Sequence, residues 1–293
     1  MKQPTIAVIG NPGGWSSELL ADTVARVTGK RLLIDMNQVT LDLENRKLWC
    51  EGLDLTTINA AIVKKIGPYY APYLLDRLEI LHFLESRGVR IFSRPIHIMR
   101  VLDRLSCTTA LRMADIPMPP TCITEDIQAA LCFLRSYQQA VLKPLYSTKA
   151  RGMELIQDHP DAHIQLETFK QYNPIIYLQK RVDLRGRDLG LVFLGGEYLA
   201  TYARKNDTTS WNTTTENGGR YVSIEPDSGT IEVARKAQSL FHLDFTSVDV
   251  VETEDGPLVF EVSAFGGFKG LKTACGINGA ERYLDYVLKR LTS

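Results

Sequence analysis

Two acidic side chains in the C-terminal part of the chain have the type and the spacing to bind a cation. Two β-rich runs flank the turn at 254–256, which is typical of a hairpin. A three-residue loop closed by its glycine puts Thr253 opposite Pro257, and Asp249 then lies opposite Glu261. Carboxylates opposed at about 5 Å repel each other unless one takes up a proton or a cation lies between them.

Magnesium suits such a pair of carboxylates, because Mg²⁺ prefers oxygen ligands and takes one or two acids beside waters and substrate phosphates. The alternative interpretation is a partly solvated strand face whose acids point into water. Alternation of side chains along a strand also predicts two faces for the hairpin. The face with the acids carries Ser247, Val251, Val259 and Ser263, and the apolar face carries Val248, Val250, Leu258, Phe260 and Val262.

Length, charge and cysteine content narrow the class of protein. With 293 residues the chain is long enough for about two domains and a real core. Its 34 basic and 34 acidic side chains give zero net charge, which offers no support for binding to nucleic acid or to a membrane. Five scattered cysteines, with no evident signal peptide, indicate a cytoplasmic protein with reduced thiols.

Strand and helix signals alternate over the first hundred residues. The candidates for strands are 5–9, 31–35, 60–66 and 89–92. Helical spacing of apolar residues is clear at 73–86, so the alternation predicts a doubly wound α/β layer. The prolines between 116 and 120 indicate a linker into a second unit.

Several short motifs follow one another through this second unit. They are Asp103-Arg104, Val141-Leu-Lys-Pro144, Tyr177-Leu-Gln-x-x-Val182, Arg187-Asp-Leu189, Gly218-Gly219, Val248-Asp249, Glu261-Val262 and Gly267-Phe-Lys-Gly-Leu271. In this order they resemble the RimK-like ATP-grasp ligases over residues 100–293. The resemblance implies an ATP-grasp fold at 103–293, preceded by a doubly wound α/β pre-ATP-grasp domain at 1–102. The lid subdomain would span about 120–182 and the catalytic subdomain about 183–293.

The resemblance also implies which residues bind ATP and metal. Lys143 would reach the α- and β-phosphates as a point charge, and Arg204 would stabilise charge on the transferring phosphoryl group. The implied ATP-binding residues are Arg104, Lys143, Gln179, Lys180, Arg181, Val182, Asp188 and Thr214, of which 179–182 form the adenine hinge. The implied ligands of Mg²⁺, or of Mn²⁺, are Asp249, Glu261 and Ser263. The loop at 145–152 would close over the phosphates.

An activity follows from the same resemblance. A substrate carboxylate would attack the γ-phosphate of ATP to give an acyl phosphate, and an amine would then displace phosphate and form a C–N bond. The protein would supply positioning and charge rather than a covalent nucleophile. Two alternatives stay open: a kinase that phosphorylates a hydroxyl, and a nucleotide-binding protein without catalysis. The expected partners are a small-molecule, peptide or protein-tail carboxylate and an amine, with a homo-oligomer as a further option.

Some positions depart from the pattern of the family. They are Ser263 and Thr214, where asparagine is usual, Gly190, where arginine is usual, and Arg104, where lysine is usual. A missing charge-assisted hydrogen bond at Gly190, worth about 1.5–3 kcal/mol, requires binding energy from elsewhere. Trp211 in a polar loop and Trp15 after a glycine turn are candidate contacts. We therefore expect a substrate larger than a free amino acid, such as a peptide or a protein tail.

Overall fold

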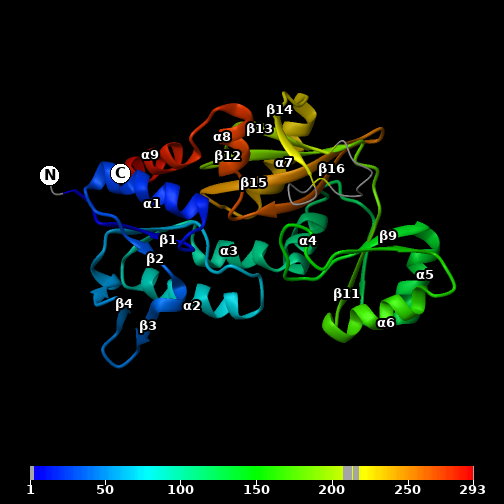
Figure 1. Ribbon diagram of the computed structural model, residues 1–293, viewed down its shortest axis with the longest axis horizontal. Helices are drawn as coiled ribbons and strands as arrows, with labels where there is room; N and C mark the ends of the chain where they lie inside the picture. Colours follow the sequence, from blue (N-terminus) through cyan, green and yellow to red (C-terminus); the bar gives the residue numbers. More distant parts are fainter. Residues whose placement is uncertain (1–2, 207–212, 214–217, 293) are drawn as a thin grey trace.

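The protein consists of three units in a row, each built on its own sheet (Figure 1). The computed structural model describes residues 3–206, 213 and 218–292. The N-terminal unit lies at one end, the unit of β8 to β11 at the other, and the long C-terminal sheet between them. This arrangement is a mixed α/β fold, as the sequence predicts.

The N-terminal unit is a parallel sheet with helices on both faces. Its strands run in the order β2 (Leu33–Ile34), β1 (Ile6–Ile9), β6 (Ala60–Val63) and β7 (Arg90–Phe92). Helices α1 (Trp15–Thr28) and α9 (Gly279–Thr292) cover one face, and α2 (Tyr73–Ser86) and α3 (Pro95–Leu102) cover the other (Figure 1). A small sheet of β3 (Val39–Asp42), β4 (Lys47–Cys50) and β5 (Leu53–Asp54) extends from this unit, with short helices η1 (Met36–Gln38) and η2 (Leu55–Thr57) beside it.

The alternation of apolar residues along β1 explains why both faces are covered. Ile6 and Val8 pack in one core cluster with α1 and α9, whereas Ala7 and Ile9 pack in another with α2 and α3. Strand side chains point to opposite faces in turn, so a strand that is apolar throughout must be buried on both sides. The predicted doubly wound layer is confirmed, although the predicted strand at 60–66 ends earlier, at Val63.

Helix α4 (Arg104–Met113) leads into an antiparallel sheet. The Asp103 carboxylate caps α4 by accepting a hydrogen bond from the Leu105 amide. The strands follow the order β10 (Glu154–Gln157), β9 (Gln139–Leu142), β11 (Ile176–Lys180) and β8 (Thr121–Thr124). Helices α5 (Ile127–Tyr137) and α6 (Ala162–Tyr172) pack against this sheet in a core of their own.

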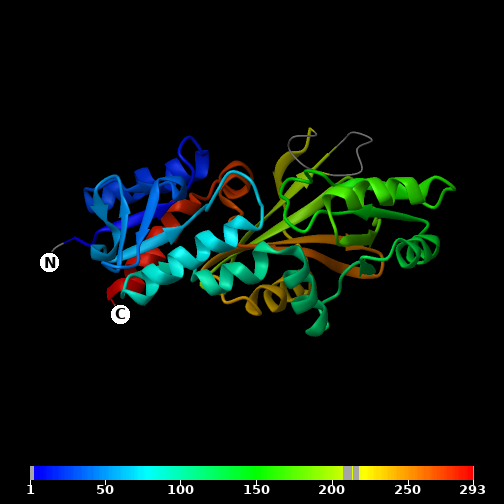
Figure 2. The same ribbon diagram turned by 90° about the horizontal axis from the view of Figure 1, so that it is seen from below.

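The C-terminal sheet is antiparallel and contributes the acidic residues. Its order is β14 (Arg220–Ser223), β13 (Glu197–Lys205), β12 (Arg187–Leu194), β15 (Phe245–Thr253) and β16 (Gly256–Ser263). Helix α7 (Ser228–Ser239) packs in one core cluster with β12 and β15, and α8 (Phe268–Cys275) packs in the other. The view from below shows this sheet bridging the two smaller units (Figure 2).

The β15–β16 hairpin keeps the predicted pair of acids but reaches it by a different register. Thr253 pairs with Gly256, so the predicted three-residue loop and the pairing of Thr253 with Pro257 are wrong. A bulge between Asp249 and Val250 then shifts the register by one residue and restores the predicted pairing of Asp249 with Glu261. The two departures compensate for each other.

The bulge also changes which side chains share a face. Val259 pairs with Val250 and joins Val248 in the core, whereas Phe260 lines the same cavity as the acids. The predicted face assignments of Val259 and Phe260 are therefore exchanged, because the extra residue of a bulge reverses the alternation beyond it.

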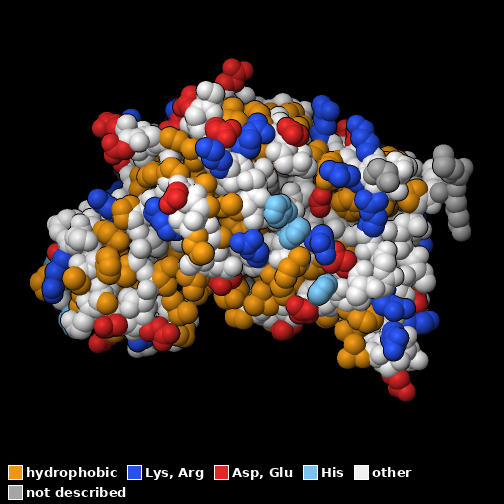
Figure 3. Space-filling view, turned by 180° about the vertical axis from the view of Figure 1, so that it is seen from behind, with side chains coloured by type: hydrophobic (Ala, Val, Ile, Leu, Met, Phe, Trp, Pro, Cys, Tyr) orange, Lys and Arg blue, Asp and Glu red, His pale blue; other side chains and the backbone are white. Residues whose placement is uncertain are grey.

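The surface of the molecule mixes charges of both signs. On the face shown in Figure 3, basic and acidic side chains are interspersed among apolar ones. In the described part of the chain, no helix combines the length and the apolar character needed to cross a membrane.

Candidate functional site

A cavity of about 390 Å³ lies where the three units meet. Its wall takes residues from the end of β6, from α4, from β11 and from the β15–β16 hairpin. The predicted site residues in the described part of the chain all line it: Arg104, Lys143, Gln179, Lys180, Arg181, Val182, Asp188, Arg204, Asp249, Glu261 and Ser263. Thr214 and Trp211 lie outside the described residues. The fold thus gathers these residues into one cavity, while their roles in binding stay predictions.

Each of the paired acids has an arginine as its counter-charge. Arg204 Nη2 lies 2.9 Å from an Asp249 carboxylate oxygen, and Arg104 Nη1 lies 3.0 Å from one of Glu261. Burial raises the pKa of Asp249 to about 7; Arg204 opposes this shift, and Glu261 adds to it. The two acids are thus paired as predicted, and each has an arginine that offsets part of the expected repulsion.

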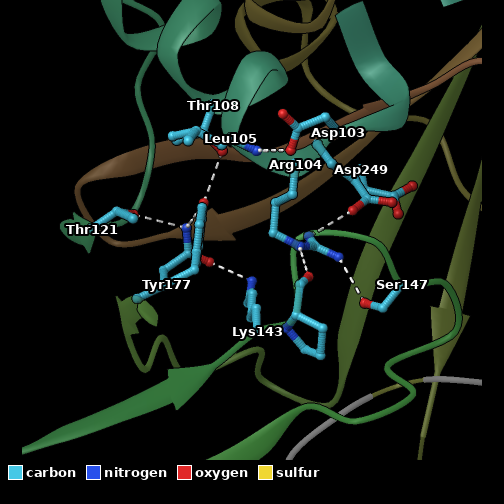
Figure 4. A network of polar contacts seen from close by, with 12 residues as sticks. Asp103, Arg104, Leu105, Thr108, Thr121, Lys143, Ser147, Tyr177 and Asp249 are labelled. Carbon is cyan, nitrogen blue, oxygen red and sulfur yellow. Dashed lines mark hydrogen bonds and ion pairs between the residues drawn. The ribbon is translucent and has the colours of Figure 1, made fainter. Parts of the chain in front are cut away.

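Arg104 connects three segments of the site (Figure 4). Its guanidinium donates to the Pro144 carbonyl at 3.1 Å and to the Ser147 hydroxyl at 3.2 Å, in addition to its ion pair with Glu261. It is 8% exposed, so these partners are its main interactions. Arg104 therefore ties the loop after Lys143 to the strand that carries Glu261.

Lys143 ends in a buried polar network. Its ammonium donates to the Gln179 side-chain oxygen at 2.5 Å, and the Gln179 amide donates to the Thr121 hydroxyl at 3.0 Å. Tyr177 shares a 2.9 Å hydrogen bond with Thr108 in the same network (Figure 4). Burial and the nearby Arg104 together lower the pKa of Lys143 to about 7, against the opposing effect of Glu261 and Asp249. A lysine so placed has a charge that a bound anion would stabilise.

The predicted adenine hinge has two of its amides already engaged. The Lys180 amide donates to the Pro120 carbonyl at 2.8 Å, and the Arg181 amide donates to the Gln139 carbonyl at 3.0 Å. Within the described residues, the Val182 amide donates no hydrogen bond, and Val182 lines the cavity. If this segment binds a base, Val182 is the residue whose amide can donate to it.

Asp188 is buried, lines the cavity and forms an ion pair with Arg204. It is 5% exposed, accepts from the Arg204 guanidinium at 3.0 Å, and accepts from the Thr213 hydroxyl. Burial alone would lower the pKa of Arg204. The nearby carboxylates of Asp188 and Asp249 have the larger effect, so the pKa is raised above its usual value. Asp188 thereby fixes the position of Arg204, a role that the sequence analysis does not assign to it.

Tyr202 fills the space beside Gly190. A Cβ atom at Gly190 would lie 2.4 Å from the Tyr202 ring, and one at Gly270 would lie 2.5 Å from it. The ring also packs edge-on against Tyr221, and Tyr202 lines the cavity. No larger residue fits at position 190 while Tyr202 stays there, which gives the departure from arginine a structural cause. Sequence reasoning missed Tyr202, because nothing in its neighbourhood marks it.

Of the two tryptophans predicted to contact the substrate, only Trp15 lies in the described part of the chain. Trp15 is 44% exposed and lies beneath the Lys272 ammonium at 5.6 Å, outside the residues that line the cavity. Its role as a substrate contact stays a prediction. Trp211 lies outside the described residues.

The donor set of the site fits a hard cation. Asp249 and Glu261 pair across adjacent strands, and the Ser263 hydroxyl belongs to the same cavity. Two carboxylates with a neutral oxygen match what Mg²⁺ accepts from a protein that leaves the rest of the shell to water and phosphate. In the residues described, no cluster of three or more histidine, cysteine or acidic side chains forms a separate metal centre.

The chain combines a doubly wound layer, an antiparallel sheet with two helices and a larger antiparallel sheet, which meet at a cavity with paired acids. This combination defines an ATP-grasp protein. The model of the RimK-like ATP-grasp domain matches residues 101–287, so the chain belongs to this family. The tetrahydromethanopterin:α-L-glutamate ligase of Methanosarcina acetivorans is 26% identical, over 98% of this chain and 99% of that one. A probable α-L-glutamate ligase of Citrobacter koseri is 27% identical, over 79% of this chain and 77% of its own length.

Solved structures share the fold at low sequence identity. The ATP-grasp ligase PsnB, in a complex with a precursor variant, Mg and ADP, superposes with a TM-score of 0.76 at 17% identity, covering 99% of this chain and 100% of that one. A RimK-domain ATP-grasp protein of Sphaerobacter thermophilus gives 0.75 at 20% identity, over 96% of this chain and 98% of its own. Together with the named ligases, the family makes this chain an ATP-dependent ligase that forms C–N bonds. The Mg–ADP complex supports the use of ATP and Mg²⁺ in the family.

Proposed function

We propose that this chain joins a carboxylate to an amine through an acyl-phosphate intermediate. The observation that carries the proposal is the pairing of Asp249 with Glu261 in a cavity whose other walls supply Lys143, Arg104 and Arg204. Paired acids attract a cation and the basic side chains attract phosphate, and a protein that transfers a phosphoryl group needs both.

The first step transfers the γ-phosphoryl group of ATP to the substrate carboxylate. The carboxylate oxygen attacks phosphorus, the bond to the β-phosphate oxygen breaks, and ADP leaves with that electron pair. Lys143 is held by Gln179 and would contact the α- and β-phosphates, while Arg204, fixed by Asp188, would contact the transferring group. Asp249, Glu261 and Ser263 would hold Mg²⁺, which neutralises charge on the phosphates when it is bound.

The second step forms the C–N bond. The amine nitrogen attacks the acyl carbon, the bond from that carbon to the phosphate oxygen breaks, and phosphate leaves as an anion. The amine loses a proton to water or to the departing phosphate. Basic side chains around the cavity would stabilise the phosphate as its charge develops.

A peptide or protein tail is our proposal for the carboxylate substrate. Solved neighbours of this fold include PsnB in complex with a precursor peptide and a macrocyclase bound to its own precursor peptide. These two proteins show that the fold can present its site to a chain, and the curated relatives named above act with α-L-glutamate. The identity of the amine would follow from the same substrate screen.

Trapping with hydroxylamine tests the intermediate. With Mg-ATP and a panel of acids and peptides, hydroxylamine should convert an acyl phosphate into a hydroxamate detectable by mass spectrometry, and ADP release should require the acid. The Asp249→Asn variant should give none. ADP formation with phosphate on a substrate hydroxyl, and no hydroxamate, would contradict the proposal and favour a kinase.

A further inference from the structure

Two lysines follow strand β6 at the edge where the N-terminal unit meets the cavity. Lys64 and Lys65 come directly after Val63, the last residue of β6. Ligands of open parallel sheets bind beyond the carboxyl ends of the strands, so this edge is where the N-terminal unit can contribute to a site.

Lys64 is fully used by the protein. Its ammonium donates to the carbonyls of Phe265 at 3.0 Å and Gly266 at 3.1 Å, and it lies 3.8 Å from the centroid of the Phe268 ring. It is 2% exposed, so no ligand can reach it. Lys64 thereby holds the loop that follows Ser263 against the N-terminal unit.

Lys65 has no such partners. It is half-buried, lines the cavity, and its ammonium lies 5.1 Å from the centroid of the Phe265 ring. Across the part of the chain that the structure describes, no carboxylate forms an ion pair with Lys65. The charged group that acts on it is another cation, Lys149, which also lines the cavity.

An unbalanced cation in this position carries an energetic cost. Burial, together with repulsion by Lys149, lowers the pKa of Lys65 to about 8. The group still carries a proton at neutral pH, and its charge is offset by no described side chain. Burying an unpaired charge destabilises the free protein. An anionic ligand that binds beside such a charge therefore gains a large stabilisation from it.

The wall that Lys65 occupies differs from the wall expected to hold the nucleotide. Lys143 follows β9 and Val182 follows β11, whereas Lys65 belongs to the N-terminal unit and lies by the loop after Ser263. An anion at Lys65 would therefore be a part of the carboxylate substrate rather than a phosphate held by Lys143.

We infer that Lys65 binds a carboxylate of the substrate that does not itself react, and so selects substrates with a second anionic group near the reacting one. This assignment rests on the proposed ligase function and makes Lys65 a specificity-determining residue supplied by the N-terminal unit. The aromatic ring of Phe265 beside it would exclude water from the ion pair and strengthen it.

Calorimetric titration of the full chain with matched acids and amides tests the assignment. The probes are short peptides that differ only in their last residue, L-glutamate against L-glutamine and L-aspartate against L-asparagine, with Mg-ADP present. In the wild type the acid of at least one pair should bind at least tenfold more tightly than its amide. Lys65→Met should abolish the difference, and Lys65→Arg should keep most of it. Lys236→Met, at an exposed lysine of α7, should match the wild type.

Three results would overturn the inference: equal binding of acid and amide to the wild type, no measurable binding of any probe, or a preference for the acid that survives in Lys65→Met. Titration with Mg-ATP separates this failure from a failure of the proposed function. A wild type that binds ATP and yields a hydroxamate, yet does not distinguish acid from amide, contradicts Lys65 alone. A wild type that yields no hydroxamate contradicts the ligase mechanism.

Discussion

Glu261 is the acid on which the proposed metal site can be tested by a single substitution. Its carboxylate pairs with Arg104 and, through the hairpin, lies beside Asp249. Glu261→Ala should leave ATP able to bind but remove the strengthening by Mg²⁺, with a loss of about ten- to hundredfold in the metal effect, because one of two carboxylate ligands is gone. Calorimetric titration of ATP with and without Mg²⁺ measures this.

The control for that substitution is Glu254→Ala, at an 84% exposed acid in the turn of the same hairpin. This variant should keep the full effect of Mg²⁺. An effect of Mg²⁺ that is undiminished in Glu261→Ala would remove Glu261 from the metal site.

Lys143 makes stability depend on pH in a direction that can be worked out. Its pKa is lowered from 10.5 to about 7 in the folded state, so the unfolded chain binds more protons between those values. Stability therefore rises with pH across this window, and the cost of burying the charge is fully present below pH 7. Lys143→Met should stabilise the ligand-free protein by on the order of 3 kcal/mol more at pH 6 than at pH 9.5.

Denaturant unfolding of both proteins at the two pH values checks this, with Lys236→Met as an exposed control. The comparison between pH values removes the part of the effect that comes from losing the hydrogen bond to Gln179. A stability difference that is the same at pH 6 and pH 9.5 would show that Lys143 keeps its ordinary pKa.

At the scale of the strand pairs, Tyr202 and Gly190 fix how β12 and β13 pack beneath the cavity. Gly190→Ala should destabilise the protein by about 1–3 kcal/mol, since its Cβ would collide with the Tyr202 ring. In a Tyr202→Ala background the same change should cost much less, because the ring is absent. Unfolding of the two single variants and the double variant measures this coupling. Equal costs in both backgrounds would mean that the strands shift instead.

The hairpin of β15 and β16 shows how far sequence could predict these elements. Alternating apolar residues and a glycine turn identify the two strands and the pair Asp249 and Glu261. They do not identify the bulge between the pairs of Asp249 and Val250, because a bulge depends on the twist and packing of the neighbouring strands rather than on a local signal. The exchange of Val259 and Phe260 between the faces follows from that omission.

In the site, too, sequence motifs predict which residues take part, but they do not predict which residues contact one another. Ordered motifs locate Lys143, Arg204 and the acids, but the partners Asp188 and Arg204 lie 16 positions apart in sequence, and Arg104 and Glu261 lie 157 apart. Two lysines after an apolar strand were a signal that could have indicated Lys65, since such strand ends often bind ligands. The domain division at 102/103 stays a prediction.

At the scale of the whole molecule, the helix α9 ties the C-terminal part of the chain to the N-terminal sheet. Leu284 and Tyr283 of α9 share a core cluster with Leu20 of α1 and Ile6 of β1. Leu284→Ala should cost about 2–5 kcal/mol. Hydrogen exchange should show faster opening in β1 and β6 as well as in α9, because all three share this core.

Lys289→Ala, at an exposed position of the same helix, is the matched control and should leave exchange unchanged. If Leu284→Ala accelerated exchange in α9 alone, the helix would be an appendage that the N-terminal sheet does not need.

The contact of α9 with α1 has a consequence for how the protein is made. Ribosomes synthesise the N-terminal layer first, yet Leu20 and Val24 of α1 are covered by a helix that begins at Gly279. At about 5–20 residues per second, more than ten seconds separate the two segments. During that interval the nascent chain presents an apolar stripe, so α1 is where we expect a chaperone to bind first. The earliest part of the chain to emerge is thus among the last to reach its final packing.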